Sequence, residues 1–317
     1  MRTISGAPLA GYGPRSLVFW LWWALVLGVA AGCTRDRGPL GSEKNPVKLF
    51  FVPSVEAKVL EDSSKIFKKF LEEKTPYKFS ISIPTSYIAV VEAFGTKRAD
   101  VASLNTFGYI LAHEKYGVEA AVTVMRHGSS KYKAQIVARS DSGIQSVADL
   151  NGKKFAFVDP ASTSGYLLPM KLLRENSVKP AQTVWANKHD NVISMVYQKQ
   201  VDAGATFYSP PEDGDIQDAR RLVRQQYPDV EKVIKIVTLT EEIPNDPVVF
   251  RKDLPEAMKK DILNALLEFV KSEEGRQAFF SLYGVTELKK ATDADYDGVR
   301  KMLVALGQDA QDLVQKK

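Results

Sequence analysis

The chain has 317 residues, of which 43 are basic and 38 acidic, and its formal net charge at pH 7 is +5. This surplus is mild, and basic side chains alternate with acidic ones without forming a basic block, which argues against a nucleic-acid-binding protein. About 270 residues follow the N-terminal segments described below, more than one hydrophobic core usually holds, so we expect two lobes.

The N-terminal segment indicates an exported protein. Arg2 and Arg15 precede an apolar run, residues 17–31, whose length suits the core of a signal peptide and is short for a membrane span. Small residues then lead into Cys33, the only cysteine, and resemble a bacterial lipoprotein processing site, although leucine is more usual three positions before the cysteine. We predict that residues 1–32 are removed and that Cys33 carries lipid; the alternative is an uncleaved helical anchor.

The segment after the cysteine predicts a flexible connection. Residues 33–46 are charged and rich in glycine and proline, which is typical of a tether. Beyond it, short apolar runs alternate with amphipathic helical segments, the pattern of an α/β protein. From Pro255 onward the pattern predicts helices throughout. The expected strands cover residues 47–52, 77–83, 99–104, 120–125, 134–139, 154–158, 201–207 and 233–239.

One segment carries the clearest chemical signal. An apolar run over residues 154–158 ends at Asp159, and the sequence Ser162, Thr163, Ser164 and glycine then opens a predicted helix. The first N–H groups of a helix, its dipole and three hydroxyls suit a phosphate-like or carboxylate group. The alternative is that one hydroxyl simply caps the helix, but three in a row followed by glycine exceed what a cap requires.

An internal repeat supports a two-lobed arrangement. Residues 87–100 align without gaps on residues 189–202, and each copy predicts a helix, a turn and a strand. Each helix opens with a hydrogen-bond donor, Tyr87 or His189, and ligands of open α/β sheets bind where strands end and helices begin. We therefore expect these two residues on opposite walls of one cleft. The aspartate that ends each copy is interpreted as a structural turn residue.

With these motifs the chain resembles the periplasmic substrate-binding proteins of phosphonate, phosphite and phosphate ABC importers. The resemblance extends over residues 47–306 and implies the α/β type-2 periplasmic-binding-protein fold, with two hinge crossings. Lobe 1 would comprise residues 46–131 and 246–317, and lobe 2 residues 132–245. The motifs that carry the resemblance are residues 162–169, supported by residues 149–153, 201–203 and 243–247.

The resemblance also implies the site. In that family the S-T-S-G turn binds phosphonyl oxygens, and two tyrosines and a histidine add donors. The implied ligand-binding residues here are Tyr87, Tyr132, Ser162, Thr163, Ser164 and His189. A tetrahedral oxyanion offers enough acceptor sites for all these donors, and a site dominated by neutral donors would release its cargo readily. Two ordinary alternatives remain: His189 as a solvent-facing helix cap, and Tyr132 as a cross-strand aromatic residue.

One departure from the family concerns the cargo. Members that bind aminoalkyl phosphonates place a glutamate, which pairs with the ammonium group, where this chain has Ser209. Asp246 or Glu212 could supply a carboxylate instead, and we include Asp246 among the ligand-binding residues. Because an unpaired ammonium would bind poorly, we expect a simple phosphonate, phosphite or phosphate.

The function implied is that of an extracytoplasmic lipoprotein that captures this anion between its lobes and delivers it to an ABC permease, in the periplasm or at the cell surface. We expect a monomer without metal or cofactor. A phosphoester hydrolase with Ser162 or Ser164 as nucleophile is less consistent, because no G-x-S-x-G motif and no metal-spaced histidines are present. A sensory ligand-binding module would have the same fold.

Overall fold

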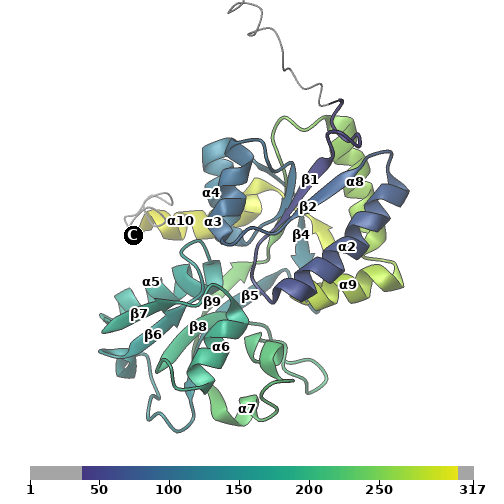
Figure 1. The fold of residues 1–317 in the computed structure, drawn as a ribbon. Coiled ribbons are helices and arrows are strands. Elements are labelled where there is room, and N and C mark those ends of the chain that lie inside the picture. The colour runs from purple at the N-terminus through teal and green to yellow at the C-terminus, as the bar shows by residue number, and fades with distance from the viewer. Residues whose placement is uncertain (1–37, 306–317) are drawn as a thin grey trace, which may run out of the picture. The chain divides into compact units, whose positions relative to one another are not determined.

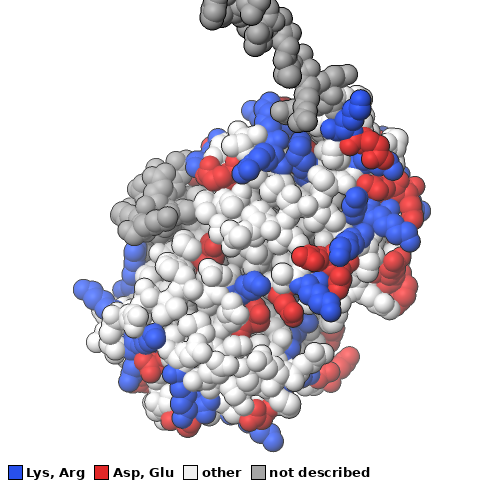
Figure 2. Space-filling view, viewed as in Figure 1, with Lys and Arg blue, Asp and Glu red and all other residues white. Residues whose placement is uncertain are grey.

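The computed structural model describes residues 38–305, so the predicted signal peptide and Cys33 lie outside the described part of the chain. Residues from Leu40 onward belong to one compact unit. Within the described range, no helix combines the length and the apolar character needed to cross a bilayer. On the face shown in Figure 2, basic and acidic side chains are intermixed, in keeping with the mild net charge.

Lobe 1 is built on a six-stranded mixed sheet with the order β11-β4-β10-β3-β1-β2. Figure 1 labels strands β1, β2 and β4 of this sheet. Strands β1, β2 and β3 are parallel, whereas β10 runs antiparallel to β3 and β4. The strands are β1 (Val47–Phe51), β2 (Phe79–Ser82), β3 (Val101–Ser103), β4 (Glu119–Met125), β10 (Pro247–Phe250) and β11 (Glu287–Lys290). The helices are α2 (Ala57–Lys74), α3 (Tyr87–Gly95), α4 (Thr106–Tyr116), α8 (Glu256–Phe269), α9 (Glu273–Tyr283), the 3-10 turn η4 (Asp293–Tyr296) and α10 (Asp297–Ala305).

Apolar helix faces cover both sides of this sheet. Leu60 and Phe67 of α2 are buried in one core together with residues of α8 and α9, and Val90 and Val91 of α3 are buried in another with residues of α4 and α10. Burial of such side chains at roughly 1.5–3 kcal/mol each is the main force that holds these helices to the sheet. The loops at the strand ends are thereby held in place around the cleft.

Lobe 2 has a five-stranded sheet with the order β7-β6-β8-β5-β9. Strands β6, β7 and β8 are parallel, and β5 runs antiparallel to β8 and β9. The strands are β5 (Lys131–Arg139), β6 (Lys154–Phe157), β7 (Gln182–Trp185), β8 (Ala203–Tyr208) and β9 (Ile234–Pro244). The helical elements are η1 (Ala148–Leu150), η2 (Thr163–Leu167), α5 (Leu168–Glu175), α6 (His189–Tyr197), η3 (Ala219–Val223) and α7 (Val230–Val233).

The chain passes between the two sheets twice, through residues 126–130 and through Asn245 and Asp246. The two crossings are joined to each other: Asn245 N donates to Ser130 O at 2.8 Å, and Asn245 Nδ2 donates to Ser129 O at 2.8 Å. Arg126 binds Asn245 Oδ1 and Asp246 Oδ2, both at 2.7 Å. A charged pair therefore lies where the lobes meet.

The internal repeat is confirmed in three dimensions. Helices α3 and α6 each have nine residues and are each followed by a lysine at positive φ, Lys97 at 53° and Lys199 at 59°. The closing aspartates make equivalent bonds, because Asp100 Oδ2 accepts from Lys48 N at 2.9 Å and Asp202 Oδ2 accepts from Lys154 N at 2.8 Å. The prediction that both aspartates are structural is confirmed.

The α/β class and the two sheets agree with the sequence-based prediction, but three strands were not predicted. The expectation that residues after Pro255 are helical throughout is wrong, because β11 pairs with β4. Strand β11 has the sequence Glu-Leu-Lys-Lys and β7 is largely exposed, and both lie at sheet edges. Such short edge strands lack the apolar alternation that marks a strand in sequence.

Candidate functional site

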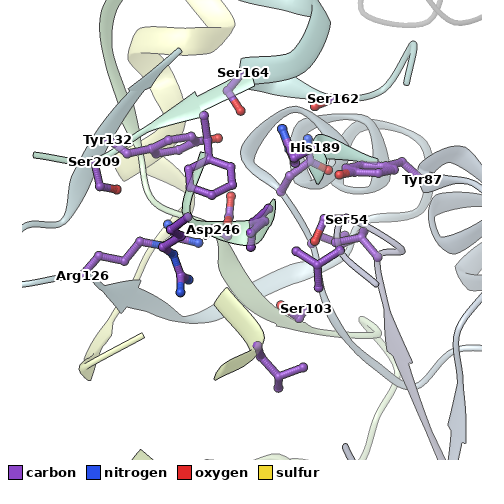
Figure 3. Close-up of a pocket in the computed structure, with 18 residues that line it drawn as sticks. Ser54, Tyr87, Ser103, Arg126, Tyr132, Ser162, Ser164, His189, Ser209 and Asp246 are labelled. Carbon is purple, nitrogen blue, oxygen red and sulfur yellow. Dashed lines mark hydrogen bonds and ion pairs between the residues drawn. The ribbon is translucent and has the colours of Figure 1, made fainter. Parts of the chain in front are cut away.

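A buried pocket lies between the lobes and is lined from both of them (Figure 3). Its volume of about 60 Å³ corresponds to roughly four to six water-sized sites, which suits a small anion. The polar lining residues are Ser54, Tyr87, Ser103, Asn105, Arg126, Tyr132, Ser162, Ser164, His189, Ser209, Arg221 and Asp246. Of the seven ligand-binding residues expected from the sequence, six line this pocket, and Thr163 does not.

The Ser-Thr-Ser-Gly turn opens a helix at the pocket wall. Ser162 is the N-cap of the π-helical turn η2, and its Oγ accepts from Gly165 N at 3.1 Å. Ser162 therefore caps its own helix and also lines the pocket, as does Ser164. The turn packs so closely on the end of β6 that a Cβ at Gly165 would lie 2.4 Å from Val158 Cγ2. Only glycine fits there, which explains its place in the motif.

Thr163 lies between the same two serines but faces the other lobe. Its Oγ1 accepts two hydrogen bonds from lobe 1, from Asn105 Nδ2 and from Phe107 N, both at 2.9 Å. Its side chain is fully buried and does not line the pocket. The hydroxyl thus links the lobes, whereas the sequence-based hypothesis assigns it to the ligand.

Tyr87 and His189 begin the two equivalent helices and line the pocket from different lobes. Each helix start is bonded across the cleft: Tyr87 N donates to Asp159 Oδ2 at 3.3 Å, and His189 N donates to Ser54 O at 3.2 Å. His189 is only 6% exposed, so the solvent-facing alternative is wrong. The repeat therefore closes the pocket symmetrically from two walls.

The His189 imidazole is neutral at ordinary pH. Burial, and next the positive charge of Arg126, lower the pKa of His189 to about 3. Its Nδ1 lies 2.8 Å from Thr206 Oγ1, and this contact orients the ring, which lines the pocket. A bound dianion would oppose both effects and favour the protonated ring.

Tyr132 and Asp246 form a second polar group with Arg126. The guanidinium carbon of Arg126 lies 5.5 Å from the centroid of the Tyr132 ring, while its Nη2 donates to Asp246 Oδ2. Burial, and to a lesser extent the Asp246 charge, raises the pKa of Tyr132, so the phenol remains a proton donor. Its hydroxyl interacts with the side chains of Ser164 and Thr163. Tyr132 is thus both a cross-strand residue, opposite Ile243, and part of the pocket lining.

The two arginines are the main feature that sequence reasoning missed. We expected neutral donors to dominate, yet Arg126 and Arg221 both line the pocket. Arg126 comes directly after a predicted strand, and this position at a strand end was the one feature of the sequence that could have indicated a place in the pocket. Arg221 lies in η3, between β8 and β9, where no element was predicted. Among the described residues, no group of three or more metal-ligating side chains is present.

Two α/β lobes joined by two crossings around a buried polar pocket define the class of two-lobed solute-binding proteins. Residues 49–296 match the family described as ABC transporter, phosphonate, periplasmic substrate-binding protein, and the chain belongs to this family. Members of this family bind a substrate for a transporter and are not enzymes, so the hydrolase hypothesis is set aside.

Individual relatives agree with this assignment. A phosphonates-binding periplasmic protein of Escherichia coli is 25% identical over 245 residues, which cover 74% of this chain and 69% of the relative. A phosphate-import protein of Mycolicibacterium smegmatis is 28% identical over 202 residues, which cover 58% of this chain and 63% of the relative. A solved Prochlorococcus marinus structure in complex with methylphosphonate has a TM-score of 0.71 at 19% identity, covering 83% of this chain and 98% of that one. Because the identity is only 19%, this last similarity is evidence for the fold alone.

Proposed function

We propose that this periplasmic binding protein captures a small phosphorus oxyanion, namely a phosphonate, phosphite or phosphate, in the pocket between its lobes. The observation that supports this most directly is the convergence of Ser162, Ser164, Tyr87 and His189, from both lobes, on one small buried cavity. Hydroxyl, phenol and imidazole donors match the many acceptor sites of a tetrahedral oxyanion. The relatives above are named for phosphonate and phosphate, which is the same chemistry.

The charge balance of the lining favours an anion. Arg126 and Arg221 contribute two positive charges, Asp246 contributes one negative charge and His189 is neutral. The pocket therefore keeps one positive charge in a low-dielectric setting, where Coulomb attraction is stronger than in water. Neutral donors still outnumber the guanidinium groups, and the Arg126 charge is compensated by Asp246.

The lining also disfavours an ammonium substituent. Ser209 lines the pocket at the position where an acid would be needed, and Glu212 is exposed and paired with His127. Asp246 is the remaining carboxylate, and it is already engaged by Arg126 at 2.7 Å. We therefore infer that cargo without an amino group is preferred.

We further propose that the mature protein is held at the membrane by lipid on Cys33 and acts as a monomer that passes its ligand to an ABC permease. Residues 33–46 would form a flexible tether between the lipid anchor and the folded lobes. The proposal rests on the single cysteine that follows a signal-peptide-like segment.

Calorimetry on the mature protein tests the ligand assignment. Replacement of both Ser162 and Ser164 by alanine removes two donors to a charged ligand, each worth about 1.5–3 kcal/mol. Affinity for phosphate, phosphite and methylphosphonate should fall by a factor of ten or more. The control is Ser140→Ala, an exposed serine whose hydroxyl bonds only Lys232 O. If the double variant binds every candidate as tightly as the parent protein, the turn is only a helix cap.

A further inference from the structure

Arg221 is a partly buried cation that the assigned site leaves without a counter-ion. It lies in η3 of lobe 2 and lines the pocket. Its guanidinium reaches toward lobe 1, where its carbon lies 5.6 Å from the ring centroid of Phe280 in α9. The side chain therefore spans the cleft and meets elements of both lobes.

Among residues 38–305, no carboxylate lies within ion-pair distance of this guanidinium, and the Arg221 Nε atom is buried without a hydrogen-bond partner. Asp218 attracts it from further away, but the Asp218 carboxylate is held by Arg220 at 2.8 Å. Burial, and next the like charge of Arg126, lower the pKa of Arg221. Because a charge that is partly withdrawn from water and lacks a counter-ion is costly, this arrangement favours an anionic partner that arrives with the ligand.

Arg221 lines the same pocket as the residues expected to hold the phosphorus group. Arg221 lies close enough to Arg126 for the two charges to act on each other. Figure 3 shows Arg126 and Ser209 on the side of the pocket away from Tyr87. Asp246 lies between that side and Tyr87. A phosphonyl group held by Ser162 and Ser164 would leave its substituent the part of the pocket near Arg126 and Ser209, and Arg221 lines the same pocket.

We propose that Arg221 binds an anionic group on the ligand's substituent, so that the cargo includes short phosphonates that carry a carboxylate. This inference rests on the proposed function and specifies its substrate class. A guanidinium recognises a carboxylate through two parallel hydrogen bonds, and the Ser209 hydroxyl can donate to the same group. The small cavity volume limits the acid to a short one, and phosphonoacetate, with one carbon between phosphorus and carboxylate, is the natural probe.

The experiment is calorimetry with phosphonoacetate and methylphosphonate on the full-length mature protein and three variants. Arg221→Gln should lose at least tenfold in affinity for phosphonoacetate and a distinctly smaller factor for methylphosphonate, which is affected only by the loss of one positive charge from the pocket. Arg221→Lys should lie between Arg221→Gln and the parent protein. The matched control is Arg224→Gln, because Arg224 follows the same turn but pairs with Asp215 and Glu231. It should bind both ligands as the parent protein does.

Each other outcome overturns the inference. Equal losses for both ligands would mean that Arg221 acts on the phosphorus group, and no loss for either would mean that it is structural. If the parent protein binds methylphosphonate but not phosphonoacetate, this inference fails and the proposed function stands; if it binds no phosphorus anion, both fail. If Arg221→Gln does not fold, the inference is tested on the parent protein alone. The parent protein should bind phosphonoacetate at least tenfold more tightly than the uncharged amide of phosphonoacetate.

Discussion

Thr163 Oγ1 in lobe 2 accepts a hydrogen bond from Asn105 Nδ2 in lobe 1, at 2.9 Å across the cleft. Phe107 N donates to the same oxygen, and the helix starts at Tyr87 and His189 are also bonded to the opposite lobe. Thr163, the middle residue of the Ser-Thr-Ser-Gly turn, therefore joins the lobes, while its two neighbours line the pocket. We therefore expect that ligand binding to Ser162 and Ser164 is coupled to lobe closure through Thr163.

Thr163→Val should weaken ligand binding without removing a pocket-lining side chain. Valine has a similar shape but leaves two donors of lobe 1 without this acceptor, at about 0.5–1.5 kcal/mol each. Because the closed state becomes less favourable, affinity for any phosphorus anion should fall about five- to a hundredfold. Calorimetry measures the loss, and X-ray scattering at saturating ligand should still show the closed dimensions. Thr163→Ser keeps the hydroxyl and should bind normally; equal affinity of the valine variant would show that these bonds do not stabilise closure.

The ligand-free protein should lose stability as the pH falls because of His189. Its pKa in the folded protein is lowered to about 3 from 6.5, so the unfolded chain takes up the proton first. Between these values the histidine reduces the free energy of unfolding by up to about 1.4 kcal/mol for each pH unit of decrease. Urea unfolding at pH 7, 6 and 5 should therefore show a shallower decline for His189→Gln than for the parent protein.

The matched control for this pH experiment is His113→Gln, which removes a histidine outside the pocket. A constant difference in stability between His189→Gln and the parent protein from pH 7 to pH 5 would contradict the prediction.

Gly165→Ala should destabilise lobe 2. The added Cβ would lie 2.4 Å from Val158 Cγ2, and such overpacking typically costs about 1–3 kcal/mol. Denaturant unfolding should show this loss, and adding Val158→Ala should recover part of it relative to the sum of the single changes. Gly298→Ala is the control, because a Cβ there meets nothing within 4 Å. Simple additivity of the two changes would rule out the steric explanation.

The protein should select its ligand by the charge of the substituent on phosphorus, which we expect to lie near Ser209. Burying an ammonium without a partner costs several kcal/mol, so methylphosphonate, phosphite or phosphate should bind at least about tenfold more tightly than 2-aminoethylphosphonate. Ser209→Glu should narrow or reverse this preference, and Ser209→Ala should leave it in place. Calorimetry that finds 2-aminoethylphosphonate to be the tightest ligand of the parent protein would contradict the prediction and direct attention to Asp246.

We expect lipid attachment to depend on Cys33. Cys33→Ser should leave the protein unprocessed or release it from the membrane fraction, because serine offers no thiol for lipid attachment. Fractionation and mass spectrometry of protein from its native membrane provide the measurement. An unmodified thiol at position 33 in that material would end the lipoprotein hypothesis.

Sequence alone determined the features that depend on local patterns. Alternating apolar segments predicted the α/β class, the ungapped repeat predicted matching helices that begin at Tyr87 and His189, and the Ser-Thr-Ser-Gly turn predicted a helix start at the pocket wall. These features depend on periodicity, capping and turn chemistry, which act between residues close in sequence.

Only the tertiary structure decided which charged side chains line the pocket and which residues of the turn face the pocket or the other lobe. Arg126 and Arg221 come from segments far apart in the chain, and neither belongs to a sequence motif that predicts a binding pocket. Whether Thr163 faces the cavity or Asn105 depends on the packing of lobe 1 against lobe 2. The neutrality of His189 likewise follows from burial and from Arg126, because desolvation and nearby charge exist only once distant segments have been brought together.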